Sequence, residues 1–254
     1  MRTNRRFVVT QLVKTSEFPY IKYAFLEFNP PQSDFYKYYD KDVNIVVSSA
    51  TSSGKSAMLE MVIAHTVFVQ KKKAVYLSPL KALTAEKAQN WENKSHSFSN
   101  LKISIITGDY ILSESRIREL ESADIILMTT EMVNSKCRNY KSERSRWIYD
   151  VGCLCVDEAH LLGVKERGDK LEVGLLSFAA HNADARIILA SATMDNIQEL
   201  SNWTTLLNNK PTELVVSDFR PAQLNLNFHS YDDTGGYYLS EEEKVNLTIN
   251  ILEK

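Results

Sequence analysis

A segment of small and polar residues, SATSSGKS at residues 49–56, lies between two apolar runs. Such a loop lets successive backbone N–H groups turn toward a phosphate chain, and a helix that begins near Lys55 adds its dipole. The residues expected to cradle the phosphates are Thr51, Ser52, Ser53 and Gly54. Lys55 would then reach the β- and γ-phosphates, and the Ser56 hydroxyl would bind Mg²⁺. A plain serine-rich turn is the alternative, but the flanking apolar runs favour nucleotide binding.

A second polar segment, DEAH at residues 157–160, ends another apolar run. A carboxylate there is costly to bury unless it meets a cation or hydrogen-bond donors. We expect Asp157 to hold Mg²⁺ and Glu158 to be the base that orients the water attacking the γ-phosphate. An Asp that caps the next helix, with Glu in its first turn, is the alternative. The phosphate loop upstream favours an ATPase.

A third segment, SAT at residues 191–193, follows a further apolar run. Its hydroxyls could hydrogen-bond to Asp157 or His160 and respond to the state of the nucleotide. We therefore predict that His160, Ser191 and Thr193 couple the nucleotide site to the rest of the molecule. Alone, the segment is equally typical of an ordinary helix cap.

The elements that must position these segments are short runs rich in Val, Ile and Leu. The runs are Val43–Ser49, Ala74–Ser78, Lys102–Thr107, Asp124–Thr129, Gly152–Asp157, Arg186–Ser191 and Glu213–Ser217. Helical stretches between them include Leu80–His96, Ser113–Glu121, Asp169–Ala180 and Asp195–Leu207. Continuous apolar runs predict strands buried on both faces of a parallel sheet. The alternation predicts an α/β domain with helices on both faces and ligands at the carboxyl ends of the strands.

Composition narrows the class of protein. The chain has 254 residues, 44% of them hydrophobic, and a formal net charge of −2, which excludes a disordered or collagen-like chain. Three cysteines, two of them inside the apolar run GCLCVD, argue against a disulfide framework and for a buried strand. With neither a long apolar segment nor a signal-peptide pattern, we expect an intracellular protein that does not bind membranes. We expect it to be a monomer.

Together, the GKS, DEAH and SAT segments on an alternating chain resemble the first RecA-like domain of superfamily 2 DExH helicases. The finer pattern is similar to the Ski-like group, which includes DNA-repair and RNA-processing helicases. The segments that carry this likeness are FNPPQ (28–32), YLSPLKAL (76–83), ITGDY (106–110), MTTEM (128–132), KERGDKLE (165–172) and SDFRPAQL (217–224). The resemblance implies an ATP- and Mg²⁺-dependent motor in which Gln32 reads adenine and Phe28 packs near the base.

The same resemblance implies contacts with single-stranded or partly duplex nucleic acid. The residues it points to are Pro79, Lys81, Gly108, Thr129, Thr130 and Glu131. All of them follow predicted strand ends, where hydroxyls, backbone N–H groups and helix N-termini suit phosphates without reading bases. Each segment taken alone is more typical of a plain turn or helix start.

The expected organisation is an N-terminal extension (1–24), a RecA-like domain (25–224) and a linker toward an absent second RecA-like domain (225–254). Ser49 and Ala50 depart from the family's loop, which has Gly or Ala at the first position and commonly Pro at the second. Without the second domain and its arginine finger, we expect weak hydrolysis, and we favour an expressed fragment over a natural truncation. A non-catalytic regulatory module that binds nucleotide or nucleic acid is the alternative. A P-loop small-molecule kinase is disfavoured.

Overall fold

The structure is a computed structural model. It describes residues 11–108, 113–138, 143–165, 167–192, 194 and 196–221, all within one compact unit that ends at Pro221. The predicted linker and residues 1–10 lie outside the described residues.

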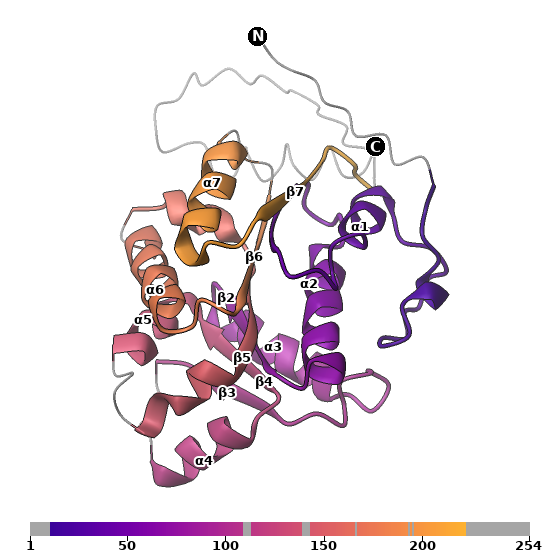
Figure 1. The fold of residues 1–254 in the computed structure, drawn as a ribbon. Helices are drawn as coiled ribbons and strands as arrows, with labels where there is room; N and C mark the ends of the chain where they lie inside the picture. The colour runs from indigo at the N-terminus through magenta and orange to yellow at the C-terminus, as the bar shows by residue number, and fades with distance from the viewer. Residues whose placement is uncertain are drawn as a thin grey trace, which may run out of the picture. The chain divides into compact units, whose positions relative to one another are not determined.

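A seven-stranded sheet forms the centre of this unit (Figure 1). Its strands are β1 (Asn44–Ser49), β2 (Lys73–Ser78), β3 (Ile103–Ile106), β4 (Ile125–Thr129), β5 (Val151–Val156), β6 (Arg186–Ser191) and β7 (Thr212–Ser217). Every neighbouring pair is parallel, in the order β3-β4-β2-β5-β6-β1-β7. The predicted α/β class and the predicted strands are therefore confirmed.

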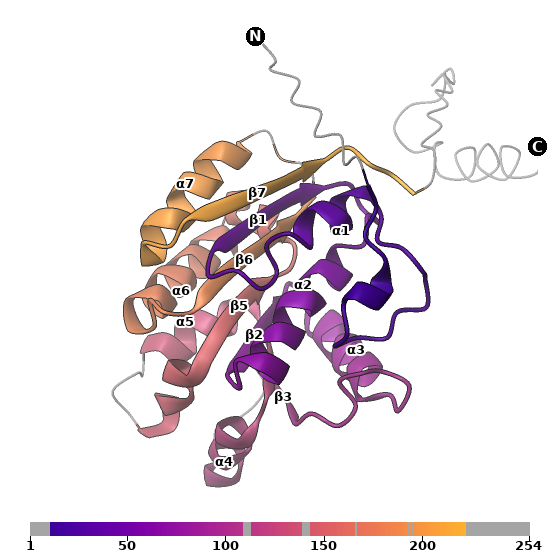
Figure 2. The same ribbon diagram turned by 45° about the vertical axis from the view of Figure 1, so that its right-hand side comes forward.

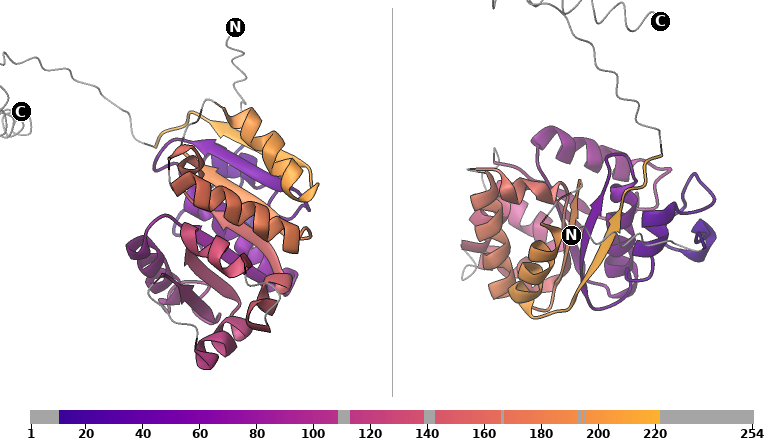
Figure 3. Two further views of the ribbon diagram at one scale, coloured as in Figure 1. Left: turned by 90° about the vertical axis from the view of Figure 1, so that its left-hand side faces the viewer. Right: turned by 90° about the horizontal axis from the view of Figure 1, so that it is seen from above.

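Helices cover both faces of the sheet (Figures 2 and 3). They are α1 (Pro30–Phe35), α2 (Lys55–Ala64), α3 (Lys81–Glu92), α4 (Glu114–Ser122), α5 (Thr130–Arg138), α6 (Arg167–His181) and α7 (Ile197–Asn208). Segments of 3₁₀ or π helix are η1 (Thr15–Glu17), η2 (His65–Val69), η3 (Glu143–Asp150) and η4 (Ala159–Gly163). The helices α1, α2 and α3 pack on one face, and α5, α6 and α7 on the other.

The central strands form because their side chains are apolar on both faces. Every residue of β1, β4, β5 and β6 is buried, and alternate residues enter two separate cores. Cys153 and Cys155 point into the α2 side as free thiols, as the sequence predicted. Burial at about 25 cal/mol per Å² of apolar surface makes these two cores the main stabilising term.

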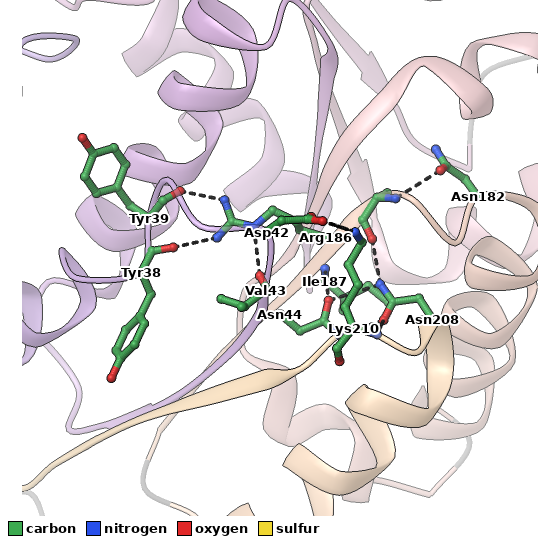
Figure 4. Close-up of polar contacts among 11 residues, drawn as sticks. Tyr38, Tyr39, Asp42, Val43, Asn44, Asn182, Arg186, Ile187, Asn208 and Lys210 are labelled. Carbon is green, nitrogen blue, oxygen red and sulfur yellow. Dashed lines mark hydrogen bonds and ion pairs between the residues drawn. The ribbon is translucent and has the colours of Figure 1, made fainter.

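A polar cluster around Arg186 closes the edge of the sheet where the strands begin (Figure 4). Arg186 is 1% exposed and donates hydrogen bonds to the carbonyl oxygens of Tyr38, Tyr39 and Val43 at 2.6–3.0 Å. The neighbouring amide Asn44 bonds to Asn208 and to the Ile187 N–H. A buried guanidinium is tolerated because its donors meet carbonyl acceptors.

Part of the segment set apart as an N-terminal extension packs onto the domain. Phe18 and Ile21 are buried in the same core as α2, and Lys14 forms a β-bridge with Glu27. The domain boundary near residue 25 stays a prediction. None of the helices among the described residues combines the length and apolarity needed to cross a bilayer.

Candidate nucleotide and nucleic-acid site

The predicted site segments meet along one edge of the sheet. Because all neighbouring strands are parallel, their carboxyl ends lie on the same side. The order along this edge is Gly108 after β3, Thr129 at the end of β4, Pro79 after β2, Asp157 after β5, Ser191 at the end of β6 and the phosphate loop after β1. Only β6 separates β5 from β1, so the two strands that lead into the nucleotide segments are about 10 Å apart.

The phosphate loop is folded tightly against itself. Ser52 and Gly54 adopt left-handed backbone conformations with φ of 63° and 85°. The Ser49 and Ser53 hydroxyls lie 2.7 Å apart in a buried hydrogen bond, while Thr51 and Ser52 are exposed. Ser49, which departs from the family's Gly or Ala, thus holds the base of the loop through Ser53.

Lys55 is the first residue of α2 and its side chain is buried under the loop, at 8% exposure. Its Nζ donates to the carbonyl oxygens of Ser49 and Ala50, each at 3.2 Å. The ammonium is therefore already at the loop that would surround phosphates. Ser56 follows in the first turn of α2 and is partly exposed.

Helix α1 is tied to the phosphate loop by two amides. Asn29 and Gln32 form a reciprocal cap at the start of α1, each side chain accepting the other's backbone N–H. Asn29 Nδ2 donates to the Ser53 carbonyl at 2.8 Å, and Gln32 Nε2 to the Gly54 carbonyl at 3.3 Å. A Cβ at Gly54 would collide with the Gln32 amide. Gln32, predicted to read adenine, is 4% exposed and contacts the loop itself.

Phe28 does not face open space next to the loop. It is 0% exposed, and its ring packs against Tyr23, Phe25 and Tyr36 at centroid distances of 5.2–6.1 Å. The structure assigns it a core contact that supports α1, whereas Phe25 keeps 40% of its surface exposed.

Both oxygens of the Asp157 carboxylate accept hydrogen bonds. Oδ2 accepts from the Tyr76 hydroxyl at 2.5 Å, and Oδ1 from the Glu158 backbone N–H at 3.0 Å. Burial, followed by the Asp157 charge, raises the pKa of Tyr76, so the hydroxyl stays a neutral donor.

Glu158 lies in the left-handed region with φ of 55°. Its Oε2 is 3.2 Å from His160 Nδ1, although the angles do not make a hydrogen bond. The structure thus brings the predicted base and the predicted coupling histidine together.

Ser191 is 0% exposed, and its hydroxyl has no hydrogen-bond partner among the described residues. It pairs in register with Ser48, directly before the phosphate loop, and Ser48 Oγ accepts from Met194 N. A buried hydroxyl without a partner is unusual and fits a residue that acquires one from a ligand or a second conformation. Thr193, the other predicted coupling hydroxyl, lies outside the described residues.

The predicted nucleic-acid residues form a more open row. Lys81 and Thr130 are the first residues of α3 and α5, where helix N-termini favour phosphate groups. Lys81 and Gly108 are exposed, Pro79 and Glu131 are partly exposed, and Thr129 and Thr130 are buried.

The side-chain oxygens at this edge suit a Mg²⁺ ion that is completed by water and phosphate oxygens. They do not suit a metal that takes all of its ligands from the protein. The described residues contain no cluster of three or more His, Cys, Asp or Glu side chains that could hold a metal. One carboxylate, Asp157, and one hydroxyl, Ser56, match the pattern in which Mg²⁺ keeps waters and takes its other ligands from substrate phosphates.

Sequence reasoning missed two residues of this site, Tyr76 and Asn29. Tyr76 could have been found because a tyrosine inside a continuous buried strand needs a hydrogen-bond partner for its hydroxyl. Asn29 followed three residues later by Gln32 is a cap pattern that could have been read directly.

A parallel sheet with a glycine–lysine–serine loop on one strand and an Asp-Glu pair two strands away defines a RecA-like nucleotide-binding domain. The chain belongs to the DEAD/DEAH box helicase family, whose model matches residues 29–200. Membership of the Ski-like group stays a prediction.

The curated proteins that resemble this chain include several DNA helicases. The chain is 35% identical to ATP-dependent DNA helicase Hel308 of Caldivirga maquilingensis over 216 residues, covering 82% of this chain and 27% of that protein. It is 39% identical to Hel308 of Pyrococcus abyssi over 181 residues, or 71% of this chain and 23% of that protein. The chain thus spans about a quarter of these relatives. The fold is also that of the helicase MrfA bound to DNA, with a TM-score of 0.59, 20% identity, and coverage of 77% of this chain and 28% of that one.

Proposed function

We propose that this chain is the N-terminal motor domain of an ATP-dependent helicase or translocase that moves on single-stranded DNA. The observation that carries the proposal is the juxtaposition of Lys55 and Asp157 at the ends of strands separated only by β6. The names of the Hel308 relatives support DNA over RNA, and the family supports ATP as the nucleotide.

Each residue would contribute through its own geometry. Lys55 would exchange its two carbonyl partners for the β- and γ-phosphates, and the loop from Thr51 to Gly54 would turn its N–H groups toward them, which would release the bond that the Ser53 N–H donates to the Ala50 carbonyl. Ser56 and Asp157 would hold Mg²⁺, which when bound neutralises charge on the phosphates. Glu158 would orient the attacking water, and His160 and Ser191 would sense the γ-phosphate.

Hydrolysis by this domain would be slow, because part of the catalytic site would lie on a second RecA-like domain. An arginine finger contributes about 10³–10⁵ in rate in related phosphoryl transfer. Pro79, Lys81, Gly108, Thr129, Thr130 and Glu131 would hold one side of the DNA strand.

Nucleotide binding by the chain tests the proposal directly. Fluorescence anisotropy of a labelled ADP should report binding that Lys55→Ala weakens and Glu158→Gln retains. A labelled single-stranded DNA oligonucleotide should bind and be displaced by unlabelled DNA. Displacement by RNA of the same sequence, measured in parallel, compares the two nucleic acids. Rapid DNA-stimulated hydrolysis by this chain would contradict a divided site. Binding of both ligands with no hydrolysis in the full-length protein would favour the regulatory module.

A further inference from the structure

Tyr76 holds the predicted Mg²⁺ ligand although it lies in the middle of strand β2. In the β2–β5 register Tyr76 is opposite Cys155, so Asp157, two residues further along, points to the same face of the sheet. The Tyr76 side chain reaches along that face and donates to Asp157 Oδ2 at 2.5 Å. Each carboxylate oxygen has two lone pairs, so this bond leaves one on Oδ2 for a metal or a metal-bound water.

The ring of Tyr76 is enclosed by a group from two helices. Trp91 of α3 packs edge-on against it at a centroid distance of 5.4 Å. Lys87 of the same helix lies over both rings, at 5.7 Å from Tyr76 and 5.6 Å from Trp91. These contacts fix the ring, and hence the direction of the hydroxyl, to helix α3.

Glu60 joins this group to the helix that follows the phosphate loop. The Trp91 indole N–H donates to Glu60 Oε1 at 2.8 Å, and Lys87 Nζ is 3.9 Å from the same oxygen. Glu60 lies on α2, whose first residue is Lys55, and Trp91 lies on α3, whose first residue is Lys81. One largely buried group of side chains therefore touches the Asp157 carboxylate and both helices that begin at predicted phosphate contacts.

We propose that Tyr76 is a positioning residue that aligns the Asp157 carboxylate for Mg²⁺ and, through Trp91 and Glu60, links that carboxylate to helix α3 and to DNA bound at its start. The inference rests on the proposed function. Residues that orient a metal ligand typically change metal affinity by about 10- to 100-fold when they are replaced. Tyr76→Phe keeps the ring packing and removes only the bond to Asp157.

The first experiment compares the affinity of the chain for a fluorescent ADP with MgCl₂ and with EDTA. In EDTA, we expect the affinity of Tyr76→Phe for the ADP analogue to stay within about two-fold of that of the unsubstituted chain. The variant should need roughly 10-fold more Mg²⁺ to reach half of the increase in ADP affinity that Mg²⁺ produces. Tyr36→Phe is the matched control, because it also removes a tyrosine hydroxyl, one bonded to the Glu17 carbonyl. An unchanged Mg²⁺ midpoint, or an equal loss with and without Mg²⁺, would overturn the positioning role. Absence of ADP binding by the unsubstituted chain would overturn the proposed function instead, and this inference with it.

The second experiment tests the link with Trp91→Phe, which keeps the ring against Tyr76 and removes the bond to Glu60. In the unsubstituted chain a single-stranded oligonucleotide should shift the Mg²⁺ midpoint by at least about five-fold, and Mg²⁺ added to the ADP-bound chain should shift oligonucleotide affinity by the same factor. In Trp91→Phe that shift should vanish. The Mg²⁺ midpoint measured without oligonucleotide should stay within three-fold of the value for the unsubstituted chain. A shift that survives in Trp91→Phe, or is absent from the unsubstituted chain, would overturn the link.

Discussion

The Arg186 cluster and the carboxyl ends of the central strands differ in how their polar groups are satisfied. Where the strands begin, Arg186 bonds to three backbone carbonyls and Asn44 to Asn208 and Ile187. Where they end, the Ser191 hydroxyl has no hydrogen-bond partner among the described residues, and Glu158 holds a left-handed backbone. Completed bonds stabilise the fold, whereas open bonding capacity and backbone strain are typical of sites that receive a ligand. The Arg186 cluster thus has completed bonds, whereas Ser191 keeps bonding capacity that a ligand could use. The contrast holds for these two clusters only, because His65 Nδ1 and Thr66 Oγ1 near the strand starts also have no partner among the described residues.

The largest expected effect is on stability and comes from the Arg186 end. Arg186→Met would leave the carbonyls of Tyr39 and Val43 without the guanidinium donor and would leave the Tyr38 carbonyl with only the Lys41 N–H, which we expect to cost about 3–5 kcal/mol of unfolding free energy. Thermal denaturation should show a fall in Tm of roughly 10 °C. Lys210→Met is the control, because its partner Asp42 is largely exposed and such pairs contribute about 0–1 kcal/mol. A loss below about 1 kcal/mol in Arg186→Met would break the comparison.

At the ligand-binding end the next effect should appear in affinity rather than stability. Lys55→Ala removes a charged donor to phosphate, worth about 1.5–3 kcal/mol, so ADP should bind roughly 10- to 100-fold more weakly. Its unfolding free energy should change by less than about 2 kcal/mol, because losing the bonds to the Ser49 and Ala50 carbonyls is offset by removing a buried ammonium. Lys41→Ala, an exposed lysine before β1, should change neither quantity in anisotropy and denaturation measurements.

Backbone strain at Glu158 predicts a smaller effect of opposite sign. Glu158→Gly should raise the unfolding free energy by about 0.5–1 kcal/mol, because glycine adopts the left-handed conformation without the steric cost and loses only part of the gain to chain entropy. Asn209→Gly is the matched control, because Asn209 follows α7 with a similar φ of 58°. Asparagine tolerates the left-handed region, so this variant should gain less stability than Glu158→Gly. Urea denaturation should therefore separate the two variants, and a destabilised Glu158→Gly would argue against stored strain.

Ser191→Ala should have the smallest effect on stability. Removing a hydroxyl without a partner should change the unfolding free energy by no more than about 0.5 kcal/mol, whereas Asn208→Ala, at the opposite end, should cost about 2–3 kcal/mol. Chemical denaturation measures both. Equal losses in the two variants would mean that the ends do not differ as the hydrogen bonds indicate.

The strands and the edge that carries the motifs were predictable because continuous apolar runs have few other stable placements. The runs ending at Asp157 and Ser191 are confirmed as β5 and β6, and the family assignment is confirmed as well. The roles of the individual site residues stay predictions.

Side-chain partners were harder to predict than strands. The bond between Tyr76 and Asp157 depends on the register of two strands 81 positions apart in sequence, which local patterns do not contain. Phe28 presented the same difficulty, since only the packing of Tyr23, Phe25 and Tyr36 around it reveals that its ring is enclosed.

The strand order also has a consequence for how the domain is made. β1, which leads into the phosphate loop, lies between β6 and β7, so Ile45 pairs with Ile188 and Glu213. On a ribosome, β1 has no partner strand until about 140 further residues have followed it. Contacts of such long sequence separation form slowly. The phosphate loop should therefore be among the last parts of the domain to form, and a nascent chain stopped before β6 should not bind nucleotide.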